Sequence, residues 1–518
     1  MSQDTHGIIE AMCSYSSRKP VRMHMPGHKG RRAFPVDYAS HALSPRRAAS
    51  LLDELRAIDM TESPGLDNLH YPSGCIRRTE ERAEKLFGSA RTYFLVNGAT
   101  SGIQASLLAV KMALGGGSLV LPRNVHKSLV SAMAMSGLEP TFVWPEYEPR
   151  LGGYLPLDWA RINDTLSGVD EDSASSPKAV FVINPTYSGF ATNLSEIAAQ
   201  VHARGMALIV DEAHGTHFSN GEGLPPNALA AGADLVTHGA HKTTVAFTQT
   251  AFLHLGLSAP ARFPGLELAA EEALRAVQTT SPSYILMASM EQAVEVLERD
   301  DGAWTDHGTR IAVELATRLS KIPGVSVAGY DEPLPAGLFH DPSKLLINLD
   351  GLSVGGPEAV RYLVQKCKVV PEMTGSRYIL LLVSGAHGPK DVDAVEKAFK
   401  GLAERFPARS HDEAAACREA AATSSMLREV PRPVRAMSLR DAFLSVARPL
   451  PVEEALGKIS ADTVVIYPPG SPIVTPGERI DQDVVEYILR ARRAGLNVLG
   501  RGVHGTEGEL KVFCVDRS

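Results

Sequence analysis

Short apolar runs alternate with longer helical patterns along the chain between about residues 90 and 255. The helical patterns include Gly102–Leu114, His126–Met135 and Leu194–Arg204. We expect the apolar runs to form strands at Thr92–Val96, Ser118–Leu121, Thr141–Trp144, Ala179–Ile183, Ala207–Val210 and Asp234–Thr237. Strands that alternate with helices in this way predict an α/β fold with a largely parallel sheet, in which the strands are buried on both faces.

The patterns on either side of this region predict further domains. Residues 1–80 are rich in Pro, Gly, His and Arg, which indicates loops and short helices. Helical patterns from Ala269 to Leu319, followed by apolar runs at Val325–Ala328 and Lys344–Asn348, indicate a second domain that mixes helices and strands. The polar, Ala-rich stretch 408–425 favours an exposed helix or a linker.

A last unit follows this stretch. It combines an apolar run at Thr463–Tyr467, a Pro-Pro-Gly turn, a helical pattern at Asp481–Ala494 and a final apolar run near Lys511–Val515. The predicted organisation is therefore an N-terminal arm over residues 1–80, a large domain over 81–285, a small α+β domain over 286–405 and a C-terminal α+β domain over 430–518.

Composition and charge narrow the class of protein. The chain has 518 residues, of which 44% are hydrophobic and 21% charged, so it can bury a sizeable core. Its 52 Lys and Arg against 59 Asp and Glu give a net charge of −7, which indicates no nucleic-acid partner. The five cysteines are scattered, which argues against a metal site or a disulfide framework. Neither a signal peptide nor a membrane-spanning run is visible, so we expect a cytoplasmic protein.

Polar residues gather where four of the predicted strands end. Asn97–Gly102 follows the strand at 92–96, and Arg123–Lys127 follows the strand at 118–121. Asp211–Gly215 and His238–Thr243 follow the strands at 207–210 and 234–237. Ligands of open α/β sheets bind beyond the carboxyl ends of the strands. We therefore expect the functional site at this edge of the sheet.

Each cluster taken alone has an ordinary structural explanation. In isolation, Asn97–Gly102 is a helix start with a hydroxyl cap, Asp211 a turn residue or a metal ligand, and His126 a surface histidine. Cys75 is expected to be a buried thiol, because no catalytic partner for it can be identified.

Together, however, the clusters supply what pyridoxal 5′-phosphate (PLP) requires. Free N–H groups and hydroxyls at a helix start hold a phosphate. A lysine amine such as that of Lys242 holds the cofactor as a Schiff base, and a carboxylate such as Asp211 pairs with the pyridinium nitrogen. A histidine face can sandwich the ring, and the small side chain of Ala213 suits the position beneath it. The combination predicts a PLP enzyme that acts on an amino acid.

An ordered series of motifs runs through the chain. They are Met25–Gly30, Gly65–His70, Val96–Gly102, Arg123–Leu129, Asp211–Gly215, His241–Thr243, Tyr467–Gly470 and Pro476–Glu478. In these motifs the chain resembles the Orn/Lys/Arg decarboxylase family of PLP fold type I, in its short bacterial form, over essentially its whole length. The resemblance implies an aminotransferase-like large domain, PLP as cofactor, and a homodimer or higher homo-oligomer with active sites at the subunit interface.

The resemblance also implies roles for individual residues. Lys242 would form the Schiff base, Asp211 would pair with the pyridine nitrogen, and His126 would stack on the ring. These three residues would be the catalytic ones. Other contacts with the cofactor would come from Thr100, Ser101, Ala213, His214 and His241.

The implied reaction is α-decarboxylation of arginine, lysine or ornithine to the corresponding polyamine-type amine. The cationic substrate tail needs a carboxylate partner, and Glu478 is our candidate, with the alternative that it caps the helix beginning near Asp481. His24 is a second candidate for a substrate contact, because the segment His24–Lys29 is expected to help form a site, in its own subunit or in the partner's.

The chain departs from the family just before Lys242. The family usually has Ser-Thr-His-Lys there, whereas this chain has Gly239-Ala240-His241-Lys242, so two hydroxyls are missing. The first of them normally donates to the cofactor phosphate. Its loss costs about 1.5–3 kcal/mol unless water, Thr243 or Thr248 replaces it. The departure indicates either tolerated drift or a changed reaction.

Three hypotheses for the function follow. The first is a basic amino acid decarboxylase. The second is another PLP reaction on a related amino acid, such as elimination, cyclisation or oxidative deamination. The third is a non-catalytic paralogue that regulates its active relatives, against which the retention of Lys242, Asp211 and His126 argues. The sequence leaves the choice among arginine, lysine and ornithine open.

Overall fold

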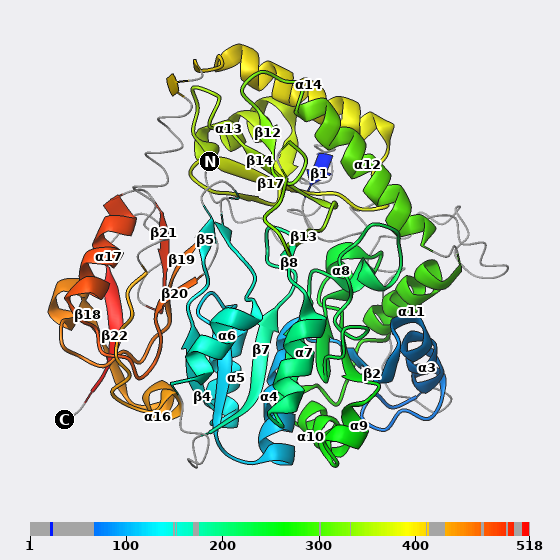
Figure 1. Cartoon of the computed structure of the whole chain (residues 1–518), viewed down its shortest axis with the longest axis vertical. Helices are drawn as coiled ribbons and strands as arrows, with labels where there is room; N and C mark the ends of the chain where they lie inside the picture. The colour runs from blue at the N-terminus through cyan, green and yellow to red at the C-terminus, as the bar shows by residue number, and fades with distance from the viewer. Residues whose placement is uncertain are drawn as a thin grey trace.

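The structure is a computed structural model, and it divides the chain into a large domain, a small domain beside it and a C-terminal domain (Figure 1). The residues that it describes are 21–23, 67–148, 151, 153–168, 176–299, 302–331, 333–410, 412–413, 430–467, 471–493, 496–501 and 510–516. Most of the expected linker at 408–425 therefore lies outside the described residues.

The large domain is built on a seven-stranded sheet of order β2-β11-β10-β9-β7-β3-β4. The strands are β2 (Ser89–Leu95), β3 (Ser118–Pro122), β4 (Glu139–Val143), β7 (Pro177–Ile183), β9 (Ala207–Asp211), β10 (Leu235–His238) and β11 (Ala251–Gly256). All six strands expected from the sequence belong to this sheet. The additional strand, β11, runs antiparallel to both of its neighbours, whereas the other neighbouring pairs are parallel. The prediction of an α/β fold with a mostly parallel sheet is confirmed.

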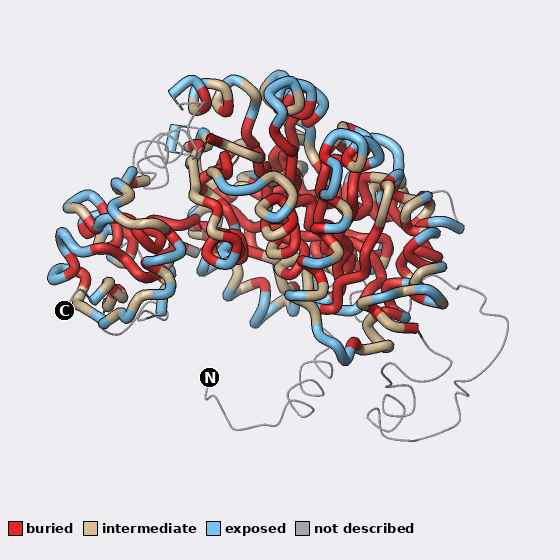
Figure 2. The backbone as a smooth tube through the Cα atoms, turned by 90° about the horizontal axis from the view of Figure 1, so that it is seen from below, coloured by how far each residue is buried: buried red, intermediate tan, exposed pale blue. Residues whose placement is uncertain are grey.

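Helices cover both faces of this sheet because its strands are apolar on both sides. Along β9, Leu208 and Val210 pack into the core on one face, and Ala207 and Ile209 pack into the core on the other. The first core includes side chains of α3 (Cys75–Phe87), α6 (Trp159–Leu166), α7 (Leu194–Ala203) and α11 (Tyr284–Arg299). The second includes α4 (Gly98–Leu114), α5 (Lys127–Ser136) and α10 (Leu266–Val277). Figure 2 shows the buried backbone concentrated in this interior.

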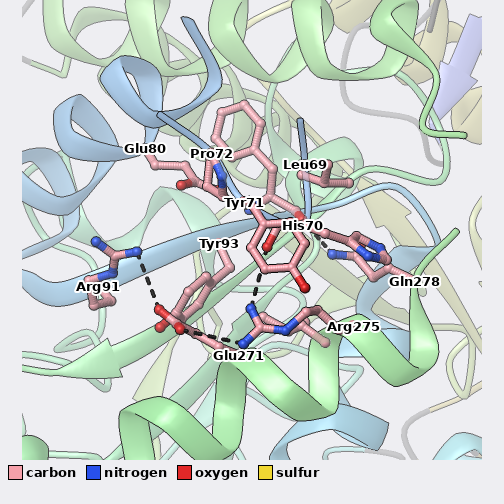
Figure 3. A pocket seen from close by; sticks show the side chains of 12 residues that line it. Leu69, His70, Tyr71, Pro72, Glu80, Arg91, Tyr93, Glu271, Arg275 and Gln278 are labelled. Atoms are coloured by element: carbon pink, nitrogen blue, oxygen red, sulfur yellow. Dashed lines mark hydrogen bonds and ion pairs between the residues drawn. The ribbon is translucent and has the colours of Figure 1, made fainter. Parts of the chain in front are cut away.

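The outer edge of the sheet, at β2, is closed by side chains. The backbone N–H groups of residues 92, 94 and 96 donate to the side chains of Glu84, Glu80 and Gln278. Gln278 also donates to the backbone carbonyl at residue 94 (Figure 3). Side chains from α3 and from the end of α10 thus take the place of a further strand, which protects an edge that is otherwise open to pairing.

The small domain has a four-stranded sheet of order β12-β14-β17-β16. Its strands are β12 (Ser326–Val327), β14 (Lys344–Asn348), β16 (Met373–Thr374) and β17 (Tyr378–Leu382), and α12 (Ala303–Leu319) and α14 (Pro389–Arg405) share its core. The N-terminal strand β1 (Val21–Met23) runs parallel to β15 (Val369–Pro371) beside this core. A pair formed by β8 (Phe190–Ala191) and β13 (Phe339–His340) links the two domains.

The C-terminal domain combines two small sheets with one helix. One sheet contains β19 (Val464–Tyr467), β20 (Ser471–Val474) and β21 (Asn497–Leu499), and the other pairs β18 (Ala447–Pro451) with β22 (Lys511–Val515). The helix α17 (Gln482–Arg493) packs into their common core. A short helix, α16 (Leu439–Leu444), places Leu439 in the core of the large domain.

A buried ion pair fastens this domain to the large domain. Both oxygens of Glu478 accept hydrogen bonds from the guanidinium of Arg123, at 2.6 and 2.9 Å. The Arg123 side chain is only 2% exposed, and it also donates to the backbone carbonyls of Pro472 and Ile473. Trp144 lies against the same guanidinium, 5.1 Å from its carbon to the ring centroid.

We expect Glu478→Ala to destabilise the docking of the C-terminal domain by about 3–5 kcal/mol, because it leaves the buried Arg123 guanidinium without its counter-charge. Urea denaturation followed by tryptophan fluorescence measures the effect, because Trp144, one of the three tryptophans of the chain, lies against this ion pair. The double variant R123M/E478L should recover most of the loss, since an apolar pair avoids the cost of desolvating two charges.

The half-exposed pair of Arg82 and Glu298 provides the matched control for this experiment. Glu298→Ala should cost less than about 1 kcal/mol, because solvent screens an ion pair at the surface. A loss for Glu478→Ala no larger than that for Glu298→Ala would contradict the role given to the buried pair.

Candidate active site

The four polar clusters predicted to meet at one edge of the sheet do so. They follow β2, β3, β9 and β10, which end at the same edge of the sheet (Figure 1). The Lys242 Nζ lies 2.9 Å from His214 Nε2, so the clusters after β9 and β10 are in direct contact. Partial desolvation lowers the pKa of His126, although one side of the residue stays exposed; the charge of Asp211 raises this pKa and the charge of Lys242 lowers it. His126, from the cluster after β3, therefore lies at the same site.

The surroundings of Lys242 favour the neutral form of its amine. It lies in the short helix α8 (Ala240–Thr243), directly after β10. Burial lowers the pKa of its ammonium group, while the charges of Asp211 and Glu372 act in the opposite direction. A lowered pKa increases the fraction of neutral amine, which is the form that attacks an aldehyde.

His214 is the direct partner of this amine. Its side chain is buried, and burial together with the Lys242 charge holds the pKa of the ring well below its usual value. The ring is therefore neutral and fixes the position of Nζ without adding a charge beside it. Tyr187 packs edge-on against the ring, with the centroids 4.8 Å apart.

Asp211 and His126 are the residues that the resemblance assigns to the ring nitrogen and to one face of the ring. Asp211 is the last residue of β9, and its Oδ1 accepts a hydrogen bond from the Ala213 N–H at 3.1 Å. His126 caps the N-terminus of α5, where its Nδ1 accepts from the Ser128 N–H. The His126 side chain is otherwise exposed, so a ring anchored at one nitrogen has a face available for stacking.

The start of α4 is suited to hold a phosphate. Asn97 precedes the helix, but its side chain accepts no hydrogen bond from the N–H groups of the first turn. Gly98 has a φ of 70°, which turns the backbone into the helix directly after β2. Ser101 is buried and donates to the Gly98 carbonyl, and Thr100 is half-buried beside it. Backbone N–H groups and the helix dipole favour an anion at this position.

The missing hydroxyl before Lys242 has a steric explanation. The Gly239 N–H donates to the Ala213 carbonyl at 3.2 Å, so the loops after β9 and β10 touch at this point. A Cβ atom on residue 239 would lie 2.7 Å from the Ala213 oxygen and 2.9 Å from the Lys242 Cδ. Of the replacements considered for the lost hydroxyl, Thr248 is exposed, whereas Thr243 is buried and its hydroxyl has no hydrogen-bond partner among the described residues.

The residues present therefore fit PLP. The uncapped start of α4 and the unused hydroxyl of Thr243 suit a phosphate, Asp211 suits the ring nitrogen, and Lys242 suits the aldehyde. His241 is held by a contact of 2.9 Å between its Nδ1 and the Thr250 carbonyl, next to Lys242. No group of three or more metal-ligating side chains occurs in the part of the chain that the structure describes.

The two substrate candidates from the sequence have different outcomes. Glu478 is only 2% exposed and is bound to Arg123, so its carboxylate is already paired with a guanidinium of this chain. The alternative for Glu478 is also wrong, because Asp481 caps the helix by accepting from the Val484 N–H. His24 lies outside the described residues.

Three residues at the site were not found from the sequence. The Tyr187 hydroxyl donates to the Glu372 carboxylate, which comes from the small domain. Lys344, on β14, donates from Nζ to the Tyr187 carbonyl at 2.8 Å, and burial lowers its pKa to about 7. Tyr187 follows the end of β7, so the rule that ligands bind at strand ends could have pointed to it. No local sequence motif marks Glu372 or Lys344.

A separate cavity of about 270 Å³ lies against the closed edge at β2 (Figure 3). Its lining contains two arginines, Arg91 and Arg275, with Glu271 between them. Neither Lys242 nor Asp211 lines it, so it does not belong to the site described above.

We expect Gly239→Ser to weaken PLP binding about tenfold or more, although it restores the hydroxyl usual in the family. The new Cβ forces the Ala213 carbonyl and the Lys242 side chain apart, and a strained close contact of this kind costs about 1–3 kcal/mol. Titration of the protein with PLP, followed by its absorbance, measures the affinity. Tighter binding by the serine variant would show that the loop relaxes and that the glycine is drift.

Comparisons with known proteins identify the family of this chain. The family model "Orn/Lys/Arg decarboxylase, major domain" matches residues 7–321, and the model of the family's C-terminal domain matches residues 420–511. Arginine decarboxylases of Bacillus anthracis and Bacillus subtilis are 32% and 31% identical over 508 and 507 residues, which cover 96% of each chain. The structure of lysine decarboxylase A from Pseudomonas aeruginosa has a TM-score of 0.74 at 20% identity, covers 99% of this chain and 83% of that chain, and shows the same fold. The chain therefore belongs to the Orn/Lys/Arg decarboxylase family of PLP-dependent enzymes.

Proposed function

We propose that this protein decarboxylates arginine at Cα, releasing CO₂ and agmatine. The observation that carries the proposal is the contact between Lys242 and His214, in a site that also holds Asp211 and His126, within a chain of this family. Arginine is favoured over lysine and ornithine because the most similar relatives named above are arginine decarboxylases.

The chain's own groups divide the work of the reaction. PLP, when bound, would supply the electron sink for cleavage at Cα. Lys242 would hold the cofactor through its amine, and the neutral His214 fixes the position of that amine. Asp211 would pair its carboxylate with the ring nitrogen, and His126 would stack on the ring. The amine of Lys242 would also return a proton to Cα.

Glu372 replaces Glu478 as the candidate that receives the cationic end of the substrate. It is half-buried, and its charge acts on the pKa of both Lys242 and Lys344. The Tyr187 hydroxyl donates to one of its oxygens and fixes its orientation. A carboxylate held in this way beside the reactive amine can pair with a guanidinium or an ammonium group.

A homodimer remains part of the proposal. In the single chain the His126 side chain is exposed, and Tyr71 is 67% exposed directly after the motif that ends at His70. An active site that is open in one subunit is suited to completion by a second one.

We also propose a cytoplasmic location, which fits the unpaired Cys75, Cys367 and Cys514. No helix among the described residues has the length and hydropathy that crossing a bilayer requires.

The decarboxylase is tested directly with purified, PLP-loaded protein and a panel of arginine, lysine and ornithine. We expect CO₂ release and the matching amine by mass spectrometry, with arginine turned over fastest. Lys242→Ala should abolish turnover, and borohydride reduction should attach PLP to the peptide that contains Lys242 in the wild type alone. Substrate-dependent spectral changes without CO₂ would favour a different PLP reaction, and PLP binding without any reaction would favour a regulatory paralogue.

Glu372→Gln tests the substrate carboxylate. We expect it to raise the KM for arginine about tenfold or more, since a charge-assisted hydrogen bond contributes about 1.5–3 kcal/mol, with a smaller change in kcat. Tyr187→Phe is the matched variant, because it removes only the hydroxyl that orients Glu372, and its effect should be smaller and in the same direction. An unchanged KM for Glu372→Gln would remove Glu372 from the substrate site.

A further inference from the structure

A line of hydrogen-bonded polar side chains crosses the buried sheet behind the active site. Glu212 Oε2 lies 2.8 Å from His238 Nε2, and His238 Nδ1 lies 3.0 Å from His254 Nε2. The line continues from His254 Nδ1 to the Thr92 hydroxyl and from there to the Ser89 hydroxyl, both at 2.8 Å. We call these five side chains the buried relay.

The relay lies on one face of the sheet and connects four strands. Glu212 follows β9, His238 ends β10, His254 lies in β11, and the two hydroxyl residues lie in β2. The side chains of Glu212, His238, His254 and Thr92 are fully buried. Phe87 packs against both imidazole rings, with centroid distances of 5.2 and 4.8 Å.

The directions of these hydrogen bonds are set together. Burial lowers the pKa of His238 to about 3 and holds the pKa of His254 well below its usual value, so both rings are neutral. A neutral imidazole has one N–H and one acceptor nitrogen. Either every donor points toward an ionised Glu212, or Glu212 is protonated and every donor points toward Ser89.

The surroundings of Glu212 favour its protonated form. Its carboxyl group receives the Ala228 N–H and contacts the neutral His238, and neither partner carries a charge that would offset an ionised carboxylate. Burial raises the pKa of Glu212 well above its usual value, and the neighbouring Asp211 charge adds to this rise, while the Ala228 hydrogen bond and the charge of His217 oppose it. An unpaired charge without solvent is costly, so the proton stays on Glu212.

The neighbour of Glu212 is the residue that matters for the cofactor. Asp211 and Glu212 are consecutive, and Asp211 faces Lys242 while Glu212 faces the relay. Two ionised carboxylates at one strand end would each raise the pKa of the other. We propose that the buried relay keeps Glu212 as a neutral acid and thereby leaves Asp211 as the one carboxylate charge at the end of β9, positioned for the ring nitrogen of PLP.

The relay also positions the two loops of the site. The hydrogen bond from Glu212 to His238 joins the residue after Asp211 to the residue before Gly239, directly beneath the contact between Gly239 and Ala213. A neutral hydrogen-bonded line avoids the desolvation of a buried ion pair and still fixes the geometry of the loops. Glu212 and His238 are thus positioning residues that act through Asp211 and Lys242.

The protonation of Glu212 can be read by infrared spectroscopy of the protein with and without PLP. A protonated carboxylic acid has a carbonyl stretch that is separate from that of a carboxylate. We expect this band at neutral pH in the wild-type protein and a decrease in Glu212→Gln, with the remaining intensity due to Glu80, since burial raises the pKa of Glu80 to about 8. A wild-type spectrum whose acid band does not change on this substitution overturns the proposal.

Binding of PLP tests the role of the relay, by titration without any substrate. Glu212→Gln replaces the acid by an amide that makes the same two hydrogen bonds, and we expect its affinity to stay within about threefold of the wild type. His238→Leu removes the acceptor of the Glu212 proton and should weaken PLP binding about tenfold or more. Weakening by Glu212→Gln as large as that by His238→Leu would mean that a charged Glu212 is required, contrary to the proposal.

A partly buried histidine outside the relay provides the control. His202 contacts Asp234 at 2.8 Å at the opposite end of β10, away from the relay. We expect His202→Leu to lower the thermal stability while leaving the affinity for PLP unchanged.

The role given to the buried relay depends on the proposed decarboxylase only in that both use PLP as cofactor. Protein that shows the acid band and these affinities but releases no CO₂ would retain the relay and lose the decarboxylase.

Discussion

The site depends on the close contact between the two loops that follow β9 and β10. The Gly239 N–H donates to the Ala213 carbonyl, and a Cβ atom on residue 239 would lie only 2.7 Å from that oxygen unless the loops shift apart. This contact places Lys242 beside His214 and within the field of Asp211. The missing hydroxyl before the lysine therefore accompanies close packing of the two loops, and this packing does not require a changed reaction.

The two faces of the sheet differ in the side chains that they place behind the site. On the face of Phe87, the line from Glu212 to Ser89 joins four strands by polar groups. On the other face, the core is apolar and includes α4, whose first turn is suited to a phosphate. The small domain contributes Glu372 and Lys344, whose charges interact with those at the strand ends. The amine of Lys242 therefore lies where the two domains meet.

Much of this arrangement was predictable because it is local or periodic. The apolar runs give all six parallel strands, and the rule that ligands bind at strand ends brings Asp211, His126 and Lys242 together. Strand β11 was missed because its residues Ala251–Gly256 follow the lysine loop without a helical spacer. Glu372 and the partner of Glu478 were missed because both depend on contacts between domains. A carboxylate near a predicted helix gives no local sign that an arginine 355 residues away will bind it.

The pairing of Arg123 with Glu478 has a consequence for the way the polypeptide is made. Arg123 begins the loop that ends at His126, and its guanidinium is buried against residues that lie 349 to 355 positions later in the chain. Until those residues have been synthesised, a nascent chain carries a cation that belongs in the interior but has no anion to receive it. The active-site loop and the C-terminal domain therefore share one electrostatic requirement, because the cation of the first has its anion in the second.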